Sequence, residues 1–146
     1  MIERDYLMRL LLNLAQGIVR SMQAEKTANS HTDSAEMLEA AIGEAVDFDG
    51  ETFLALAPDS IAQILQISGT DSRASLYIAN SLYLASHYRA KAGQDELARV
   101  RKEQALAVAR AFGHDLSSYE EGDGEASAEA IVSEAQRLID ENPDEA

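Results

Sequence analysis

The sequence predicts an all-helical protein, and two observations carry that prediction. Apolar residues recur at spacings of three and four through most of the chain, as they do on one face of a helix. No stretch alternates apolar and polar residues for long enough to be a strand. At 146 residues the chain fits one domain, which can bury about 70% of the surface that its unfolded chain exposes. We therefore expect about six helices around one core.

The stretch 76–88 is the predicted centre of the fold, because its apolar side chains point in every direction around a helix. A helix that is apolar all round must be surrounded by other helices. It runs on to Gly93, a typical C-terminal cap, and a second helical pattern covers 95–112. Residues 73–112 are therefore expected to form an antiparallel helix pair against which the other helices pack.

The first predicted helix covers residues 2–24 and has a broad apolar side. Its polar arc spans about 80° on a wheel of 3.6 residues per turn, and Met8 and Leu12 widen the apolar side beyond what one core contact needs. A second copy of the chain can cover this surface, which makes Met8 and Leu12 self-association candidates in a homodimer. Alternatively, the C-terminal helix folds back over it.

Three shorter helical segments are predicted between the first helix and the central pair. Asp33 followed by Glu36 resembles a capping box, and Pro58 suits the first position of a helix. The segments cover 33–46, 51–57 and 58–67, after which Thr70 or Asp71 caps the central helix.

The chain is expected to have three parts. Residues 1–113 form the helical domain, and 114–126 are an acidic linker by composition, rich in Gly, Ser and carboxylates. Residues 127–146 contain the final helix, about 127–141, with its apolar residues on one face. Because a helix of that length is marginal alone in water, we expect it to be docked on the domain.

Composition excludes several classes of protein. The net charge of −14 opposes direct binding to nucleic acid or to an anionic membrane, since both need clustered Lys and Arg. The absence of cysteine removes disulfides, thiolate metal sites and thiol nucleophiles. The N-terminal sequence lacks the basic start of a signal peptide, and no apolar run approaches the roughly 20 residues that span a bilayer. We therefore expect a cytoplasmic protein.

The charge is unevenly spread, with +3 on residues 89–110 and −10 on residues 111–146. The cationic stretch can be a docking patch for an acidic protein partner, can meet the chain's own acidic C-terminal segment, or can be an ordinary solvated face. The candidate partner-docking residues are Arg89, Arg99, Arg101 and Lys102.

A polar stripe lies on the otherwise apolar central helix. Asn80, Tyr83 and His87 fall on one face at helical spacing, and polar groups on a buried helix need partners. The stripe is either a small polar pocket for a ligand or a partner's peptide, or an internal hydrogen-bond network.

Neither a metal site nor an active site is predicted. His31, His87 and His114 lie on three different elements without a ligand at the i+3 or i+4 spacing. Aligning Gly50 with the turn glycine of a calcium loop puts Ala45 at the first ligand position. The sequence has no glycine-rich phosphate loop and no G-x-S-x-G. No cofactor is expected, and the carboxylates Glu36, Glu39 and Glu44 are most simply a solvated helix face.

Two resemblances add to this interpretation. The central pair resembles a degenerate tetratricopeptide hairpin through Leu82, Ala85, Tyr88, Gly93, Ala98 and Ala105. Residues 2–116 also resemble a family of small uncharacterised bacterial proteins through the motifs 5–9 (Asp-Tyr-Leu-Met-Arg), 53–59 and Tyr88 with Ala92-Gly93. The second resemblance implies a helical, tetratricopeptide-like fold and no established activity.

The leading hypothesis is a non-enzymatic helical scaffold that binds another protein. The alternative is a small-molecule-binding or catalytic domain with a polar pocket around Asn80, Tyr83 and His87.

Overall fold

The computed structural model describes residues 2–27, 30–46 and 48–143, and side chains among them from Arg4 onward. These residues form eight helices and no strand, so the predicted all-helical class is confirmed for them and the expected number of helices was too low. The helices are α1 (Ile2–Lys26), α2 (His31–Val46), α3 (Gly50–Leu54), α4 (Pro58–Ile67), α5 (Ser72–Lys91), α6 (Asp95–Ala111), α7 (Ser117–Glu121) and α8 (Gly124–Glu141).

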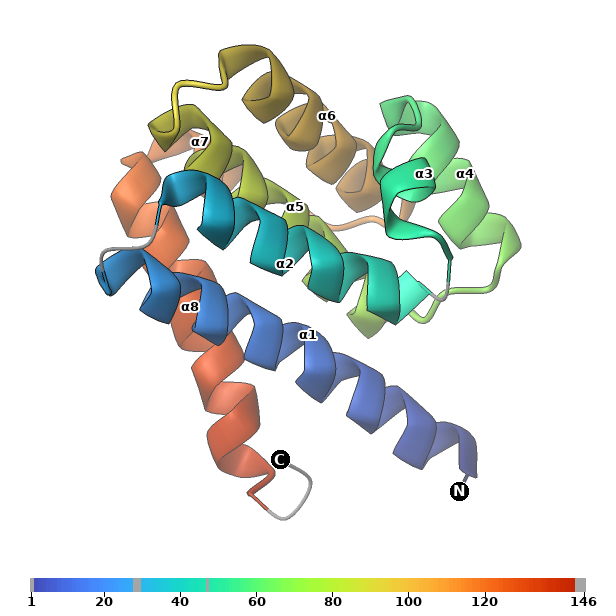
Figure 1. The fold of residues 1–146 in the computed structure, drawn as a ribbon. Coiled ribbons are helices and arrows are strands. Elements are labelled where there is room, and N and C mark those ends of the chain that lie inside the picture. The colour runs from blue at the N-terminus through green and yellow to red at the C-terminus, as the bar shows by residue number, and fades with distance from the viewer. Residues whose placement is uncertain (1, 28–29, 47, 144–146) are drawn as a thin grey trace.

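Helix α5 lies at the centre of the molecule. It packs against α6, α2, α1 and α8, and Figure 1 shows it between α2 and α6. Its start is capped by Asp71, whose side chain accepts a hydrogen bond from the backbone N–H of Arg73. Its end turns at Gly93, where a φ of 80° favours glycine. The all-round apolar pattern of the stretch 76–88 therefore corresponds to burial by four neighbouring helices.

Helix α1 is covered by α2, α5 and α8, and Figure 1 shows α8 crossing it. Leu12 is only 2% exposed and Met8 is half-buried. The prediction that Leu12 belongs to an exposed self-association seam is therefore wrong, because the chain's own helices bury it. The C-terminal helix α8 packs on α1. This is the alternative expected from the sequence, in which the C-terminal helix folds back over the broad apolar side of the first helix.

Small residues allow helices to approach closely at two places. A Cβ atom on Gly17 of α1 would lie 2.6 Å from the Cβ of Ala41 of α2. A Cβ on Gly43 of α2 would lie 2.9 Å from the Cα of Gly50 at the start of α3. Both distances are shorter than a carbon–carbon contact permits. Glycine therefore fixes how α2 lies between α1 and α3.

Two boundaries differ from the sequence prediction. The hydroxyl of Ser30 accepts a hydrogen bond from the N–H of Asp33, so α2 begins before the proposed capping box. The predicted linker 114–126 contains α7 and the first turn of α8. The hydroxyl of Ser127 donates to the carbonyl of Tyr119 and joins these two helices.

Among the described residues, none of the helices is both long enough and apolar enough to cross a bilayer.

Candidate functional site

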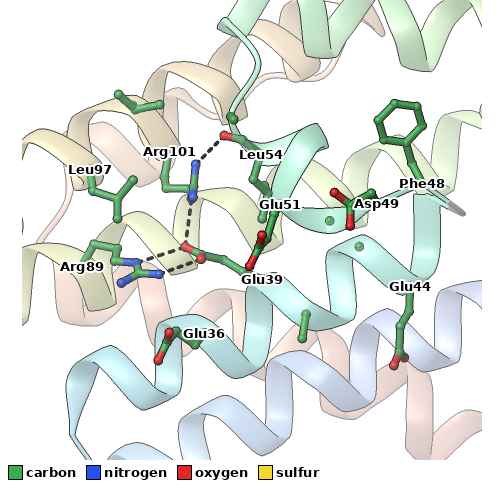
Figure 2. Close-up of a pocket in the computed structure, with 15 residues that line it drawn as sticks. Glu36, Glu39, Glu44, Phe48, Asp49, Glu51, Leu54, Arg89, Leu97 and Arg101 are labelled. Carbon is green, nitrogen blue, oxygen red and sulfur yellow. Dashed lines mark hydrogen bonds and ion pairs between the residues drawn. The ribbon is translucent and has the colours of Figure 1, made fainter.

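A pocket of about 1160 Å³ opens between α2, α3 and α6 (Figure 2). Helix α2 contributes Glu36, Ala40 and Glu44, which recur every four residues and so lie on one face of the helix. Helix α3 stands across from this face because Gly43 and Gly50 allow the two helices to touch. The third wall is the side of α6 that faces α2 and α3.

Carboxylates surround the mouth of this pocket. Glu36 and Glu44 of α2 and Glu51 of α3 are all exposed, and Figure 2 shows the first two on either side of Glu39 along α2. Within the described part of the chain, none of the three forms an ion pair. These three carboxylates are therefore free to meet cations of a partner at ion-pair distance.

The walls of the pocket are largely apolar. Leu97 and Val100 come from α6, and Leu54 and Ala55 come from the end of α3. Phe48 stands at one end, 45% exposed, with its ring edge-on to Phe53 at a centroid distance of 6.2 Å. An apolar side chain that entered this space would bury these surfaces from water, which is favourable.

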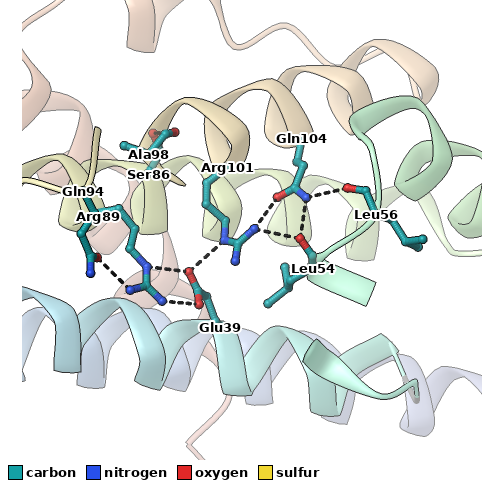
Figure 3. Close-up of polar contacts among 9 residues, drawn as sticks. All are labelled: Glu39, Leu54, Leu56, Ser86, Arg89, Gln94, Ala98, Arg101 and Gln104. Carbon is teal, nitrogen blue, oxygen red and sulfur yellow. Dashed lines mark hydrogen bonds and ion pairs between the residues drawn. The ribbon is translucent and has the colours of Figure 1, made fainter. Parts of the chain in front are cut away.

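The floor is an ion-pair network centred on Glu39 (Figure 3). Arg89 of α5 donates to both carboxylate oxygens, from Nη2 to Oε1 at 2.7 Å and from Nε to Oε2 at 3.1 Å. Arg101 of α6 donates from Nε to Oε2 at 2.9 Å. All three side chains are at least 89% buried. The network joins α2, α5 and α6 in one fixed geometry.

The same network extends to the end of α3. Arg101 Nη1 donates to the carbonyl of Leu54 at 3.0 Å, and Gln104 Nε2 donates to the carbonyls of Leu54 and Leu56 at 2.9 and 3.0 Å. Carbonyls at the end of a helix have no partner within it, so side chains of α6 supply the missing donors. The wall of the pocket made by α3 is thereby attached to α6.

Glu39 is charged at neutral pH. Burial by itself raises the pKa of a carboxyl group, but the hydrogen bonds from Arg89 and Arg101 outweigh burial and hold the pKa of Glu39 below 4.5. Conversely, the hydrogen bonds from Arg89 to Glu39 raise the pKa of Arg89. Because Glu39 keeps its charge between the two guanidinium groups, the floor is suited to holding the geometry of the pocket.

The predicted docking residues do not form one cationic patch. Arg89 and Arg101 are 93% and 94% buried and pair with Glu39, so the prediction that they face a partner from the surface is wrong. Arg99 pairs with Glu96 and Glu103 of its own helix. Lys102 lies 3.7 Å from the carboxylate of Glu120 and 5.9 Å from the ring centroid of Tyr83. Acidic side chains of the same chain thus pair with Arg99, Arg101 and Lys102 of α6.

The three residues of the predicted polar stripe, Asn80, Tyr83 and His87, do not share one pocket in the structure. Tyr83 and His87 line a second pocket, of about 460 Å³, beside α7 and the start of α8. The ring of Tyr83 lies 5.5 Å from that of Tyr119, and His87 Nε2 lies 3.3 Å from the carboxylate of Glu125. Asn80 is 4% exposed and does not line this pocket, and its Oδ1 has no partner among the described residues.

The other two histidines make separate contacts. His31 Nδ1 lies 2.8 Å from a carboxylate oxygen of Glu25, and His114 Nε2 lies 2.9 Å from the hydroxyl of Ser75. The portion of the chain that the structure describes has no group of three or more His, Cys, Asp or Glu arranged to hold a metal ion.

Glu39 is the residue of the site that the sequence interpretation missed, having placed it on a solvated face. A signal for it exists, because Glu39 follows Ala35 by four residues and precedes Ile42 by three, and both are fully buried. A carboxylate on the apolar face of a helix needs a buried cation. Arg101 carries the matching signal, since Ala98 and Ala105 flank it at the same spacings.

Comparison of the chain with protein-family models, with curated proteins and with solved structures gave no match.

Proposed function

We propose that this protein is a non-enzymatic helical interaction module that binds a partner polypeptide in the pocket between α2, α3 and α6. The partner segment carries Lys or Arg residues on both sides of an apolar side chain. The observation that carries the proposal is the combination of an apolar-walled pocket with a mouth of unpaired carboxylates from Glu36, Glu44 and Glu51.

The chemistry of the pocket supports this class of partner. An apolar anchor between Leu97, Val100 and Phe48 removes apolar surface from water. Cations beside the anchor reach the carboxylates, and charge complementarity of this kind selects partners and speeds their association. The net charge of −14 adds a long-range attraction for basic segments.

The fixed floor supports binding without catalysis. Glu39, Arg89 and Arg101 satisfy one another and hold three helices in place. A preformed pocket loses little conformational entropy when a partner binds. We also propose that α5 and α6 form a tetratricopeptide-like hairpin. The module would belong to the bacterial family that residues 2–116 resemble, and would work in the cytoplasm.

The test is a selection of binders from a random peptide library, followed by fluorescence anisotropy of the selected peptides. We expect the selected peptides to be enriched in Lys and Arg around an apolar residue. The triple variant Glu36→Gln, Glu44→Gln, Glu51→Gln is expected to weaken their binding about tenfold, because each exposed ion pair contributes on the order of 0.2–1 kcal/mol.

The matched control is Glu121→Gln, Glu129→Gln, Glu141→Gln, which removes the same charge from exposed positions outside the pocket. It is expected to bind the selected peptides within about twofold of the wild type. Equal weakening by the two triple variants would assign the effect to net charge and refute the site. Selection of acidic or purely apolar peptides would refute the partner class.

A further inference from the structure

A separate pocket, of about 600 Å³, lies where the N-terminal half of α1 meets the end of α2, α4 and the start of α5. Its floor includes Phe53, Leu65 and Ile78, each at most 3% exposed. The pocket therefore reaches from the surface to side chains of the core. Most of its other lining residues are apolar as well, as is typical of sites for small organic ligands.

The mouth of this pocket carries exposed aromatic rings. Tyr6 is 60% exposed and Phe48 is 45% exposed. In the described ranges, these are two of the four large hydrophobic side chains that are exposed. Exposed apolar surface gathered at one opening is typical of a place where something binds.

The charges at the mouth indicate what binds. Arg4 is the one cationic side chain among the described residues that line the pocket, it is exposed, and no ion pair engages it there. Of the lining residues that the structure describes, Asp71 is the one carboxylate, and its Oδ1 already accepts a hydrogen bond from the backbone N–H of Arg73 at 2.8 Å. The hydroxyl-bearing residues Ser68 and Thr70 lie at the same opening.

We propose that this pocket binds a small amphipathic acid, whose apolar chain enters toward Phe53 and Ile78 and whose single carboxylate meets Arg4 at the mouth. The proposal concerns another pocket than the partner-binding pocket between α2, α3 and α6, and of the residues that line the two pockets only Phe48 is common to both among those described. A free acid fits better than an anionic bilayer, because a chain of net charge −14 is repelled by such a surface.

The experiment is calorimetric titration of the full chain with decanoate and with decyltrimethylammonium, at about 0.15 M salt. We expect one decanoate to bind per chain, at least tenfold more tightly than the ammonium. Tighter binding of the acid than of the ammonium would not be expected from the net charge of −14, which attracts cations over the rest of the surface. Such a preference therefore indicates a local cationic group. Arg4→Gln is expected to weaken decanoate about fivefold and to tighten the ammonium about as much, because the Arg4 charge attracts the carboxylate and repels the cation.

A matched pair of substitutions on α4 tests the location. Ile64 lines the pocket, whereas Ile67 lies on the same helix at 85% exposure and does not line it. Ile64→Trp is expected to abolish decanoate binding, and Ile67→Trp to leave it unchanged. Thr70→Trp fills the mouth without replacing a core side chain, so it tests the same point if circular dichroism shows Ile64→Trp to be unfolded.

Three results would overturn the inference. If decanoate does not bind the folded wild type, the pocket is not a site for a small amphipathic acid, and its apolar surface would serve instead to bind a side chain of a partner protein. Binding of the ammonium as tightly as the acid would refute the role of Arg4. Equal effects of Ile64→Trp and Ile67→Trp would place any bound acid elsewhere.

Discussion

Glu39 stands between two guanidinium groups, and its charge is what allows Arg89 and Arg101 to be buried. We predict that Glu39→Gln lowers the free energy of unfolding by about 3 kcal/mol at neutral pH, because it leaves two buried cations without a counter-charge. Urea unfolding followed by circular dichroism measures this. Glu36→Gln, one turn away and exposed, is the control and should change the free energy by less than about 0.5 kcal/mol. If Glu39→Gln lowered the free energy of unfolding no more than Glu36→Gln does, the charge of Glu39 would contribute nothing to stability.

Tyr88 gives a second prediction, at alkaline pH. Its hydroxyl lies 3.1 Å from that of Ser21, and burial raises the pKa of Tyr88 to about 12. The unfolded chain releases this proton near pH 10.0, so the stability is intact below that pH and falls as the pH rises toward 12.

In Tyr88→Phe this loss is absent. We therefore expect the free energy of unfolding to fall more steeply with pH in the wild type than in the variant above pH 10.0. Urea titrations at a series of alkaline pH values compare the two slopes. The other buried tyrosines are common to both proteins, so parallel curves would show that folding does not raise the pKa of Tyr88.

At the scale of elements, the crossing of α1 and α2 depends on Gly17. We predict that Gly17→Ala lowers the free energy of unfolding by about 1–3 kcal/mol, since the added Cβ overlaps that of Ala41. The double variant Gly17→Ala, Ala41→Gly exchanges the two side chains and should recover part of the loss. A denaturant-unfolding cycle of the four proteins measures the coupling between them, and strict additivity would argue against a steric origin.

Most helices could be predicted because their periodicity and caps are local. Pro58, Asp71 and Gly93 each act through backbone geometry within a few residues. Helix α7 could not be predicted in this way, since it has five residues and none is buried. It is held by contacts with other helices, including the hydroxyl of Ser127 on α8 and the ring of Tyr83 on α5.

The site was less predictable than the helices. Spacing along α2 places Glu39 on the apolar face of the helix, but it does not say that Arg89 and Arg101 approach Glu39 from two other helices. Such partners lie 50 and 62 residues away in the sequence. The pocket likewise depends on how three helices meet, which periodicity in one helix does not determine.

For the whole molecule, self-association through α1 stays a prediction, now resting on Met8 and not on Leu12. Sedimentation velocity at micromolar concentration is expected to show a dimer for the wild type and a monomer for Met8→Glu, since a charge on the half-buried face opposes apolar contact. Met37→Glu is the control, because Met37 is 41% exposed on α2. A monomeric wild type would mean that α2, α5 and α8 cover α1 sufficiently.

The packing of α8 on α1 has a consequence for how the chain folds during its synthesis. About 100 residues separate the end of α1 from the start of α8. At the usual rates of translation these residues take on the order of 5–20 s to make, whereas neighbouring helices such as α5 and α6 pair within milliseconds or less. The surface of α1 that α8 covers is therefore open to chaperones throughout that interval, and the nascent chain is most exposed to aggregation there.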